Sequence, residues 1–96
     1  MDLSIVIVNL NNKKLTLECI ESIKKARSKI KKEVIVVDNG SDDGSVEALR
    51  KLKKKEKNLT LIENDDNYGY AKANNQGAKK AKGKYLLLLN NDTLVK

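Results

Sequence analysis

Three apolar stretches of the sequence each end at polar side chains that could bind a ligand. Leu3–Val8 is followed by Asn9, and Val34–Val37 is followed by Asp38. Tyr85–Leu89 is followed by Asn90, Asn91 and Asp92. Carboxylate and amide oxygens accept hydrogen bonds from a nucleobase or a ribose, and they also suit a hard divalent cation. Because the carboxyl ends of parallel strands meet at one edge of a sheet, we expect Asn9, Asp38 and Asp92 to converge there.

The two carboxylates each allow two interpretations. Asp92 lies in Asn90-Asn91-Asp92-Thr93, where it could bind a metal ion that also takes oxygens from a diphosphate, or could cap a turn. Asp38 could accept a hydrogen bond from a base or ribose, or could hold the following Gly40 loop through an Asx turn. The two roles of Asp38 are compatible with each other.

Phosphate-binding motifs of the common kinds do not occur in the sequence. There is no Gly-x-Gly-x-x-Gly after the first apolar stretch and no Gly-Lys-Ser/Thr, so the phosphates of a nucleotide would need a metal ion. A third informative segment, 67–77, contains Gly69 and Gly77, which permit close backbone approach. Its small alanines predict a helix packed tightly on a sheet, and Asn75 could reach a ligand or cap a local turn.

Apolar stretches alternate with amphipathic ones along the chain, which predicts βαβ units and a parallel sheet. We expect a single domain over 1–96 of Rossmann-like α/β architecture, with three α/β/α layers and a four-stranded parallel sheet in the order 3-2-1-4. The strands ending at the ligand-bearing positions should be buried. Asp43 or a neighbour should cap the second helix, and Gly83 should terminate the third. The expected strands are Leu3–Asn9, Glu33–Asp38, Leu59–Glu63 and Lys84–Asn90, and the expected helices are Leu15–Ser28, a segment through Val46, Leu49 and Leu52, and Ala71–Lys82.

The net charge of +7 comes mainly from lysines in the blocks Lys24–Lys32 and Lys51–Lys57. Cations at helix ends complement the helix dipole, and the rest is solvated surface. Nucleic acid is not the expected partner, because arginine is scarce and no aromatic residue lies among the lysines. A lysine-rich surface could also help to hold a protein near anionic lipid. Cys19 lies in an apolar helical pattern and should be a core residue.

The sequence contains no apolar run long enough to cross a membrane and begins a strand too early for a signal peptide. We therefore expect a cytoplasmic protein, or one at the cytoplasmic face of a membrane.

Four segments together resemble the successive motifs of family 2 glycosyltransferases, which are inverting enzymes of the GT-A fold. They are Ser4-Ile-Val-Ile-Val-Asn9, Val36-Val-Asp-Asn-Gly-Ser-Asp-Asp-Gly-Ser45, Asn67-x-Gly-Tyr-Ala-x-Ala-x-Asn-x-Gly77 and Leu88-Leu-Asn-Asn-Asp-Thr93. The last motif is most similar to the rhamnosyltransferase-like branch, where Asn-x-Asp replaces Asp-x-Asp. The match covers the whole chain in the expected order.

The resemblance implies a role for each matching residue in binding a UDP- or dTDP-sugar donor. Asp38 corresponds to the aspartate that binds the base or ribose, and Asp92 to the ligand of a magnesium or manganese ion and the diphosphate. Asn90 holds the first position of that last motif, where a neutral amide should weaken metal binding. The remaining residues expected to line the nucleotide-sugar pocket are Asn9, Asn11, Asn67, Gly69 and Asn75.

The resemblance also implies what this chain lacks. Inverting transfer needs a general base for the acceptor hydroxyl, and in the family that carboxylate lies well downstream of the Asn-x-Asp motif. No acidic residue follows Asp92. We therefore expect 1–96 to be the N-terminal, donor-binding half of an enzyme, truncated after the motif and inactive alone.

Two readings of other classes remain open, a minimal or designed α/β domain without activity and a basic interaction module. The absence of Pro, Phe, Trp and His is compatible with a designed or reconstructed sequence. If the strand over 84–90 lies at the edge of the sheet, its apolar residues should pair with another chain. A homodimer is therefore expected.

Overall fold

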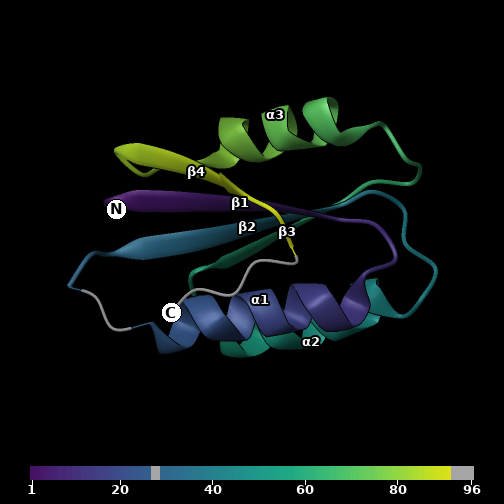
Figure 1. The fold of residues 1–96 in the computed structure, drawn as a ribbon, viewed down its shortest axis with the longest axis horizontal. Helices are drawn as coiled ribbons and strands as arrows, with labels where there is room; N and C mark the ends of the chain where they lie inside the picture. Colours follow the sequence, from purple (N-terminus) through teal and green to yellow (C-terminus); the bar gives the residue numbers. More distant parts are fainter. Residues whose placement is uncertain (27–28, 92–96) are drawn as a thin grey trace.

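The computed structural model describes residues 1–26 and 29–91, and it has the predicted α/β topology (Figure 1). The four strands form one parallel sheet in the order β3-β2-β1-β4, which confirms the order expected from the sequence. In chain order the elements are β1 (Leu3–Asn9), α1 (Lys13–Lys25), β2 (Lys32–Asp38), α2 (Ser45–Lys55), β3 (Leu59–Glu63), α3 (Tyr70–Lys80) and β4 (Tyr85–Leu89).

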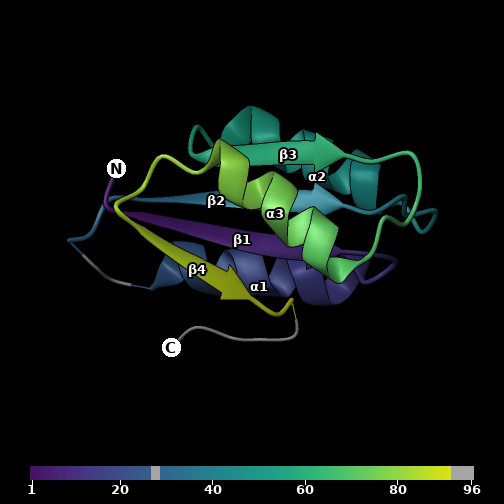
Figure 2. The ribbon, with the colours of Figure 1, turned by 90° about the horizontal axis from the view of Figure 1, so that it is seen from above.

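The helices cover both faces of the sheet, so the three-layer architecture is confirmed. Helices α1 and α2 lie on one face and α3 lies on the other (Figures 1 and 2). Alternate residues of β1 divide between two cores because side chains alternate across a strand. Ile5 and Ile7 pack with Cys19 under α1, whereas Val6 packs with Ala73 under α3. Cys19 is fully buried, as predicted.

The third helix approaches the sheet closely through its small residues. A Cβ added at Gly77 would collide with the side chain of Val6, and Ala73 is fully buried. Ala71, which the sequence suggested for the same contact, is exposed. The tight packing therefore depends on the two positions of α3 that face the sheet.

The fourth strand contradicts the expectation that all three ligand-bearing strands are buried. β1 and β2 are buried, but Tyr85, Leu86, Leu87 and Leu88 of β4 are 74, 47, 42 and 49% exposed. Figure 2 gives the reason, because α3 lies above β1 and β2 and leaves β4 uncovered at the edge of the sheet. An apolar run predicts burial only where a second layer covers it.

The amino end of the sheet is closed by a buried polar cluster. Ser4 and Glu33 are register partners on β1 and β2, and the Ser4 hydroxyl donates to Glu33 Oε2 at 2.6 Å. The backbone N–H of Lys82 donates to the same oxygen at 2.7 Å, and that of Gly83 donates to Ser4 Oγ at 2.8 Å. The loop from α3 to β4 is thus fixed to both central strands.

Gly83 does not terminate α3 as predicted, since the helix ends at Lys80 with Ala81 as its C-cap. A Cβ at position 83 would lie 2.6 Å from the backbone nitrogen of Ser4. The glycine is needed so that the loop can approach β1 closely. Among the described residues, no helix is both long enough and apolar enough to cross a bilayer.

Candidate functional site

At the carboxyl end of the sheet, two predicted site residues are in direct contact. Asn9 and Asp38 end β1 and β2 as register partners, and both are fully buried. Asn9 Nδ2 donates to Asp38 Oδ1 at 2.7 Å. The predicted convergence is therefore present for these two residues, whereas Asp92 lies outside the described residues.

The carboxylate of Asp38 organises the loop that follows it. Its Oδ2 accepts the backbone N–H groups of Gly40 at 3.2 Å and Ser41 at 2.8 Å. Its Oδ1 accepts the Ser41 hydroxyl at 2.7 Å in addition to Asn9. The Asx-turn interpretation of Asp38 is thus correct, and both carboxylate oxygens are engaged within the protein.

A chain of side-chain hydrogen bonds connects this pair to the end of β4. The Thr16 hydroxyl, on α1, donates to Asn9 Oδ1 at 2.7 Å, and Asn91 Nδ2 donates to Thr16 Oγ1 at 3.1 Å. Thr16 is 1% exposed. Sequence reasoning missed Thr16, although a hydroxyl one turn into the helix after β1 is well placed to meet a strand-end amide.

The loop after β1 is joined to the loop after β2 through Asn11. Its Oδ1 accepts the backbone N–H of Asp42 at 2.8 Å, and its own N–H donates to Ser41 Oγ at 2.9 Å. Asn11 has φ of 53°, a left-handed conformation that asparagine tolerates better than most residues. Asn11 therefore helps to shape the site as well as lying beside it.

A second cluster of amides lies between the end of β2 and the loop before α3. Asn39, which is 2% exposed, donates from Nδ2 to Asn67 Oδ1 and to the Gly69 carbonyl, each at 3.3 Å. Its Oδ1 accepts Asn64 Nδ2 at 2.9 Å. Asn67 and Gly69 are thus brought to the same edge as Asp38, while Asn39 and Asn64 were not anticipated as site residues.

Gly69 was expected to permit close approach, but nothing lies within 4 Å of a Cβ built there. Its φ of 87° is the actual requirement for glycine, since L-residues rarely adopt it.

The remaining predicted residues are distributed between the edge and the surface. The Tyr70 hydroxyl donates to Asn90 Oδ1 at 3.1 Å, which brings Asn90 to the start of α3. Asn75 is exposed on α3. Its neighbour Asn74 is 5% exposed, and its Oδ1 has no hydrogen-bond partner within the described part of the chain.

A single carboxylate accepts the first backbone N–H of both helices that border the site. Asp43 accepts the backbone N–H of Ser45, the first residue of α2, at 3.0 Å, and that of Lys13, the first residue of α1, at 3.1 Å. The N-cap positions are Gly44 for α2 and Asn12 for α1, and neither side chain makes a cap hydrogen bond. Asp43 thus binds the first N–H of each helix from outside its N-cap position. The Ser45 hydroxyl also donates to Asp43 and is the largest cause that lowers its pKa, with the two backbone N–H groups adding to the effect and partial desolvation opposing it.

Negative charge gathers at this end of the molecule, but the described residues do not form a protein-only metal centre. In 1–26 and 29–91, no group of three or more His, Cys, Asp or Glu side chains could hold a metal ion. A cavity of about 510 Å³ opens at the other end of the sheet, among side chains such as Ile20, Ile23 and Leu59. It contains none of the predicted site residues.

The fold and the site define a class, a three-layer α/β domain of GT-A type with its polar residues at the carboxyl end of a parallel sheet. Residues 4–96 match the family described as glycosyl transferase family 2. The chain is 37% identical to the poly(ribitol-phosphate) beta-glucosyltransferase of Bacillus spizizenii over 97 residues, which cover 99% of this chain and 15% of that protein. This chain belongs to glycosyl transferase family 2.

Solved structures agree with the assignment. Staphylococcus aureus TarS 1–349 in complex with UDP superimposes with a TM-score of 0.82 at 30% identity. The mannosyltransferase PcManGT of Pyrobaculum calidifontis, in complex with GDP-Man and Mn²⁺, gives a TM-score of 0.86 at 28% identity. Each comparison covers 96% of this chain and 28% of the solved one. The chain therefore spans between about a seventh and a quarter of the length of these proteins.

Proposed function

We propose that the carboxyl end of the sheet binds the nucleotide of an activated sugar. The observation that carries the proposal is the continuous hydrogen-bond network that joins three predicted site residues, Asn9, Asn11 and Asp38, through Ser41. Preorganised loops at this edge are where open α/β sheets bind ligands. The complexes of TarS with UDP and of PcManGT with GDP-Man support this placement.

The proposed donor is a UDP- or dTDP-sugar. Asp38 shapes the pocket by fixing the Gly40 turn, and the buried Asn39 fixes the loop at Asn67 and Gly69 on its other side. Amide oxygens and backbone groups in these loops can read the donors and acceptors of a pyrimidine. The TarS complexes with UDP and UDP-GlcNAc favour uridine among the candidates.

A divalent cation, magnesium or manganese, fits the chemistry of the proposed site. The exposed carboxylates of Asp42, Asp43, Asp65 and Asp66 would repel a diphosphate in the absence of a cation. Asp92 and the Asn90 side-chain oxygen would supply protein ligands, with the diphosphate completing the shell. When bound, such an ion neutralises charge on the departing nucleotide. The PcManGT complex with Mn²⁺ supports its use in related proteins.

The proposed reaction is inverting transfer of the sugar to an acceptor hydroxyl. The acceptor oxygen forms a bond to the anomeric carbon as the bond to the nucleoside diphosphate breaks, and a general base takes the hydroxyl proton. Residues 1–96 would contribute donor binding to this reaction, with the base supplied from outside them. The contribution of the chain itself is to hold the nucleotide and to orient the sugar.

The test is a ¹H–¹⁵N NMR titration of the chain with UDP, with and without Mg²⁺. We expect shifts at Asn9, Asn11 and Gly40 that saturate at lower UDP concentration when Mg²⁺ is present. UMP is the matched control, because it lacks the diphosphate and should show no gain from Mg²⁺. Replacing Mg²⁺ by Mn²⁺ should broaden the Asn90 signals by paramagnetic relaxation. A well-dispersed spectrum that UDP does not perturb would refute donor binding.

We also propose that β4 pairs with β4 of a second copy. The other outer strand, β3, is packed against α2, and Arg50 Nε donates to Glu63 at 2.9 Å. On β4, by contrast, Leu86, Leu87 and Leu88 are exposed. An uncovered apolar edge favours strand pairing. Sedimentation velocity at micromolar concentration should show a dimer that Leu87→Lys converts to a monomer, whereas a wild-type monomer would exclude it.

A further inference from the structure

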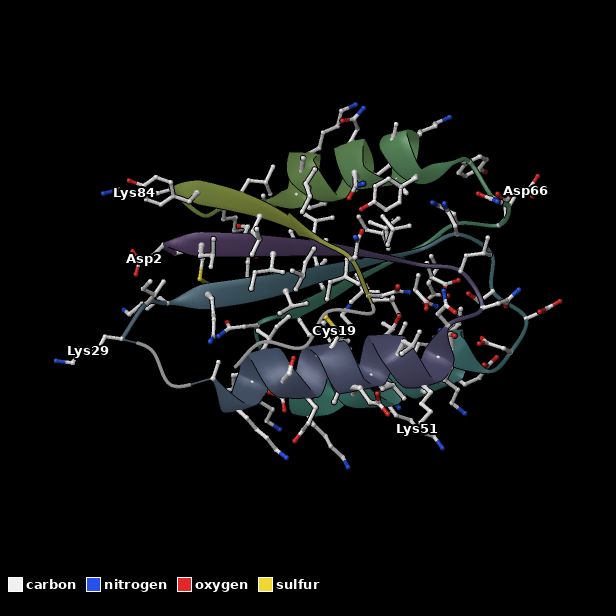
Figure 3. All side chains as sticks on the ribbon, in the orientation of Figure 1. Asp2, Cys19, Lys29, Lys51, Asp66 and Lys84 are labelled. Atoms are coloured by element: carbon white, nitrogen blue, oxygen red, sulfur yellow. The ribbon has the colours of Figure 1, made fainter. Side chains whose placement is uncertain are left out.

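The lysines of this chain gather at one end of the molecule. Because each helix runs antiparallel to the strands it connects, all three helices finish at the amino end of the sheet. Their last turns contain Lys24 and Lys25, Lys53–Lys55, and Lys79 and Lys80. Figure 3 shows Lys29 and Lys84 at the same end and Asp66 at the opposite one. We call the amino end of the sheet, with these helix ends and the loops that follow them, the basic end.

The acidic groups at the basic end leave most of this charge uncompensated. Glu56 pairs with Lys24 at 2.5 Å and Glu21 pairs with Lys25 at 3.6 Å. Glu33 is 7% exposed and engaged inside the protein, and Asp2 accepts the backbone N–H of Lys31. The lysines in the last turns of α2 and α3 are exposed and make none of the described ion pairs. Lys53 is close enough to the Glu63 carboxylate to help lower its pKa, and the others present their charge to solvent.

The opposite end of the sheet carries the exposed carboxylates of Asp42, Asp43, Asp65 and Asp66, together with Lys13 and Lys14 at the start of α1. The strands run along the longest dimension of the molecule (Figure 1), which measures 36 Å against 23 Å for each of the others. Salt at physiological strength screens charges beyond about 8 Å. A charged surface facing the basic end therefore interacts with the lysines and hardly with the acidic end.

Apolar side chains accompany the lysines at the basic end. Ile30 is 52% exposed and Tyr85 is 74% exposed. Lysine together with exposed aliphatic and tyrosine side chains suits the headgroup region of a bilayer, where the ammonium groups meet phosphates and the apolar groups enter the interface. An isoleucine has no corresponding partner on a nucleic-acid backbone, and the described residues of the basic end carry lysines where phosphate-reading proteins favour arginine.

We propose that the basic end docks on a lipid bilayer rich in anionic headgroups. The blunt face of about 23 by 23 Å brings lysines from all three helix ends to the membrane together. The long axis then stands away from the bilayer, and the carboxyl end of the sheet faces the aqueous phase. If that end binds the donor as proposed above, the sugar is transferred at a distance from the membrane surface, to an acceptor that extends from it.

The test measures binding of the chain to vesicles of phosphatidylcholine alone and with 30% phosphatidylglycerol, by co-sedimentation. Each lysine near an anionic surface contributes about fivefold to partitioning. The triple variant Lys29→Gln, Lys55→Gln, Lys80→Gln should therefore bind the mixed vesicles about 100-fold more weakly. The control variant Lys14→Gln, Lys51→Gln, Lys72→Gln has the same net charge but spares the basic end, and should change binding by less than about fivefold. Ile30→Ser should weaken the binding severalfold with no change in charge.

Vesicle binding is read without any nucleotide, so its result is independent of the donor-binding proposal. Binding that requires phosphatidylglycerol and falls only in the basic-end variant supports the docking surface. Equal losses in both triple variants would show a general effect of net charge and overturn it. Tighter binding to a DNA duplex than to the mixed vesicles at the same salt concentration would overturn the membrane proposal in favour of nucleic acid. Absence of binding to the mixed vesicles would also overturn the membrane proposal.

Discussion

The strand pair β1–β2 carries a buried carboxylate at each end, and the two differ in what they hold. Ser4 and Glu33 face each other at the amino end, and Asn9 and Asp38 at the carboxyl end. Glu33 uses one oxygen, Oε2, to accept both of its described hydrogen bonds. Asp38 uses both oxygens and accepts four.

The cluster at the amino end stabilises the fold, whereas the cluster at the carboxyl end holds the loops of the proposed binding site in place. The Glu33 cluster fixes a connection between α3 and β4 and is closed by the chain itself. The Asp38 cluster fixes two surface loops that present Asn11 and Ser41 at the edge of the sheet. Both arrangements satisfy a buried charge with several donors, as burial requires. Only at the carboxyl end does the satisfied carboxylate shape a surface that a ligand can reach.

The largest loss of stability should come from a substitution at Gly83, where the loop before β4 lies against β1. Gly83→Ala places a Cβ 2.6 Å from the backbone nitrogen of Ser4 and 2.7 Å from the carbonyl carbon of Leu3. Backbone atoms cannot move aside easily, so we expect a loss of about 3 kcal/mol or more in the free energy of unfolding. Urea denaturation followed by circular dichroism measures it.

Lys82→Ala is the control for this substitution, because the neighbouring side chain is exposed and should contribute less than about 0.5 kcal/mol. Equal stability of the Gly83→Ala variant and the wild type would show that the loop is not held against β1.

The next prediction compares Asp38 and Glu33 by replacing each carboxylate with the amide of the same shape. In Asp38→Asn, one carboxylate oxygen becomes an NH₂ group that faces hydrogen-bond donors instead of accepting from them. The free energy of unfolding should fall by about 2 kcal/mol. Glu33→Gln can keep its oxygen at the Oε2 position and both hydrogen bonds, so it should cost about 1 kcal/mol. In the folded protein, UDP affinity should fall at least tenfold for Asp38→Asn and stay within twofold for Glu33→Gln, as measured by NMR titration. Equal losses of affinity would contradict the distinction between the two ends.

A smaller effect tests the link from the site to β4. Thr16→Val preserves shape but removes the hydroxyl that donates to Asn9 Oδ1 and accepts from Asn91. An unsatisfied buried oxygen on Asn9 should lower the free energy of unfolding by about 1.5 kcal/mol. The amide signals of Asn90 and Asn91 should shift with it. Thr60→Val, on β3, serves as the matched threonine control, because the side chain of Thr60 makes none of the described hydrogen bonds. Shifts of Asn9 alone would show that β4 is not coupled to the pair.

The sequence predicted the sheet order because alternation of apolar runs and amphipathic helices leaves few right-handed topologies. It also placed Asn9 and Asp38 together, since strand ends in a parallel sheet must meet. It did not predict the exposure of Leu86–Leu88, because an apolar run does not reveal where the covering helix lies.

The full roles of Thr16 and Asn39 were not predicted from the sequence, although the place of Thr16 one turn into the helix after β1 pointed to its bond with Asn9. Both depend on partners far along the chain, Asn91 for Thr16 and Asn67 for Asn39. A residue that acts through its neighbours in sequence is easier to predict, as the hydrogen bond from the Ser45 N–H to Asp43 shows. Residues that act through distant loops required the structure.

The smallest effect concerns pH and the carboxylate that accepts the first N–H of α1 and of α2. The pKa of Asp43 lies below its ordinary value, chiefly because the Ser45 hydroxyl donates to it. A lowered folded pKa means that its contribution is complete above the unfolded pKa, near 4, and is lost as pH falls through the folded value. Because Asp43 is exposed, the contribution should be less than about 1 kcal/mol. The difference in unfolding free energy between wild type and Asp43→Asn should therefore be present at pH 6 and shrink between pH 4 and pH 3. A difference that grows on acidification would reverse the sign and refute the role of Asp43 at the two helix starts.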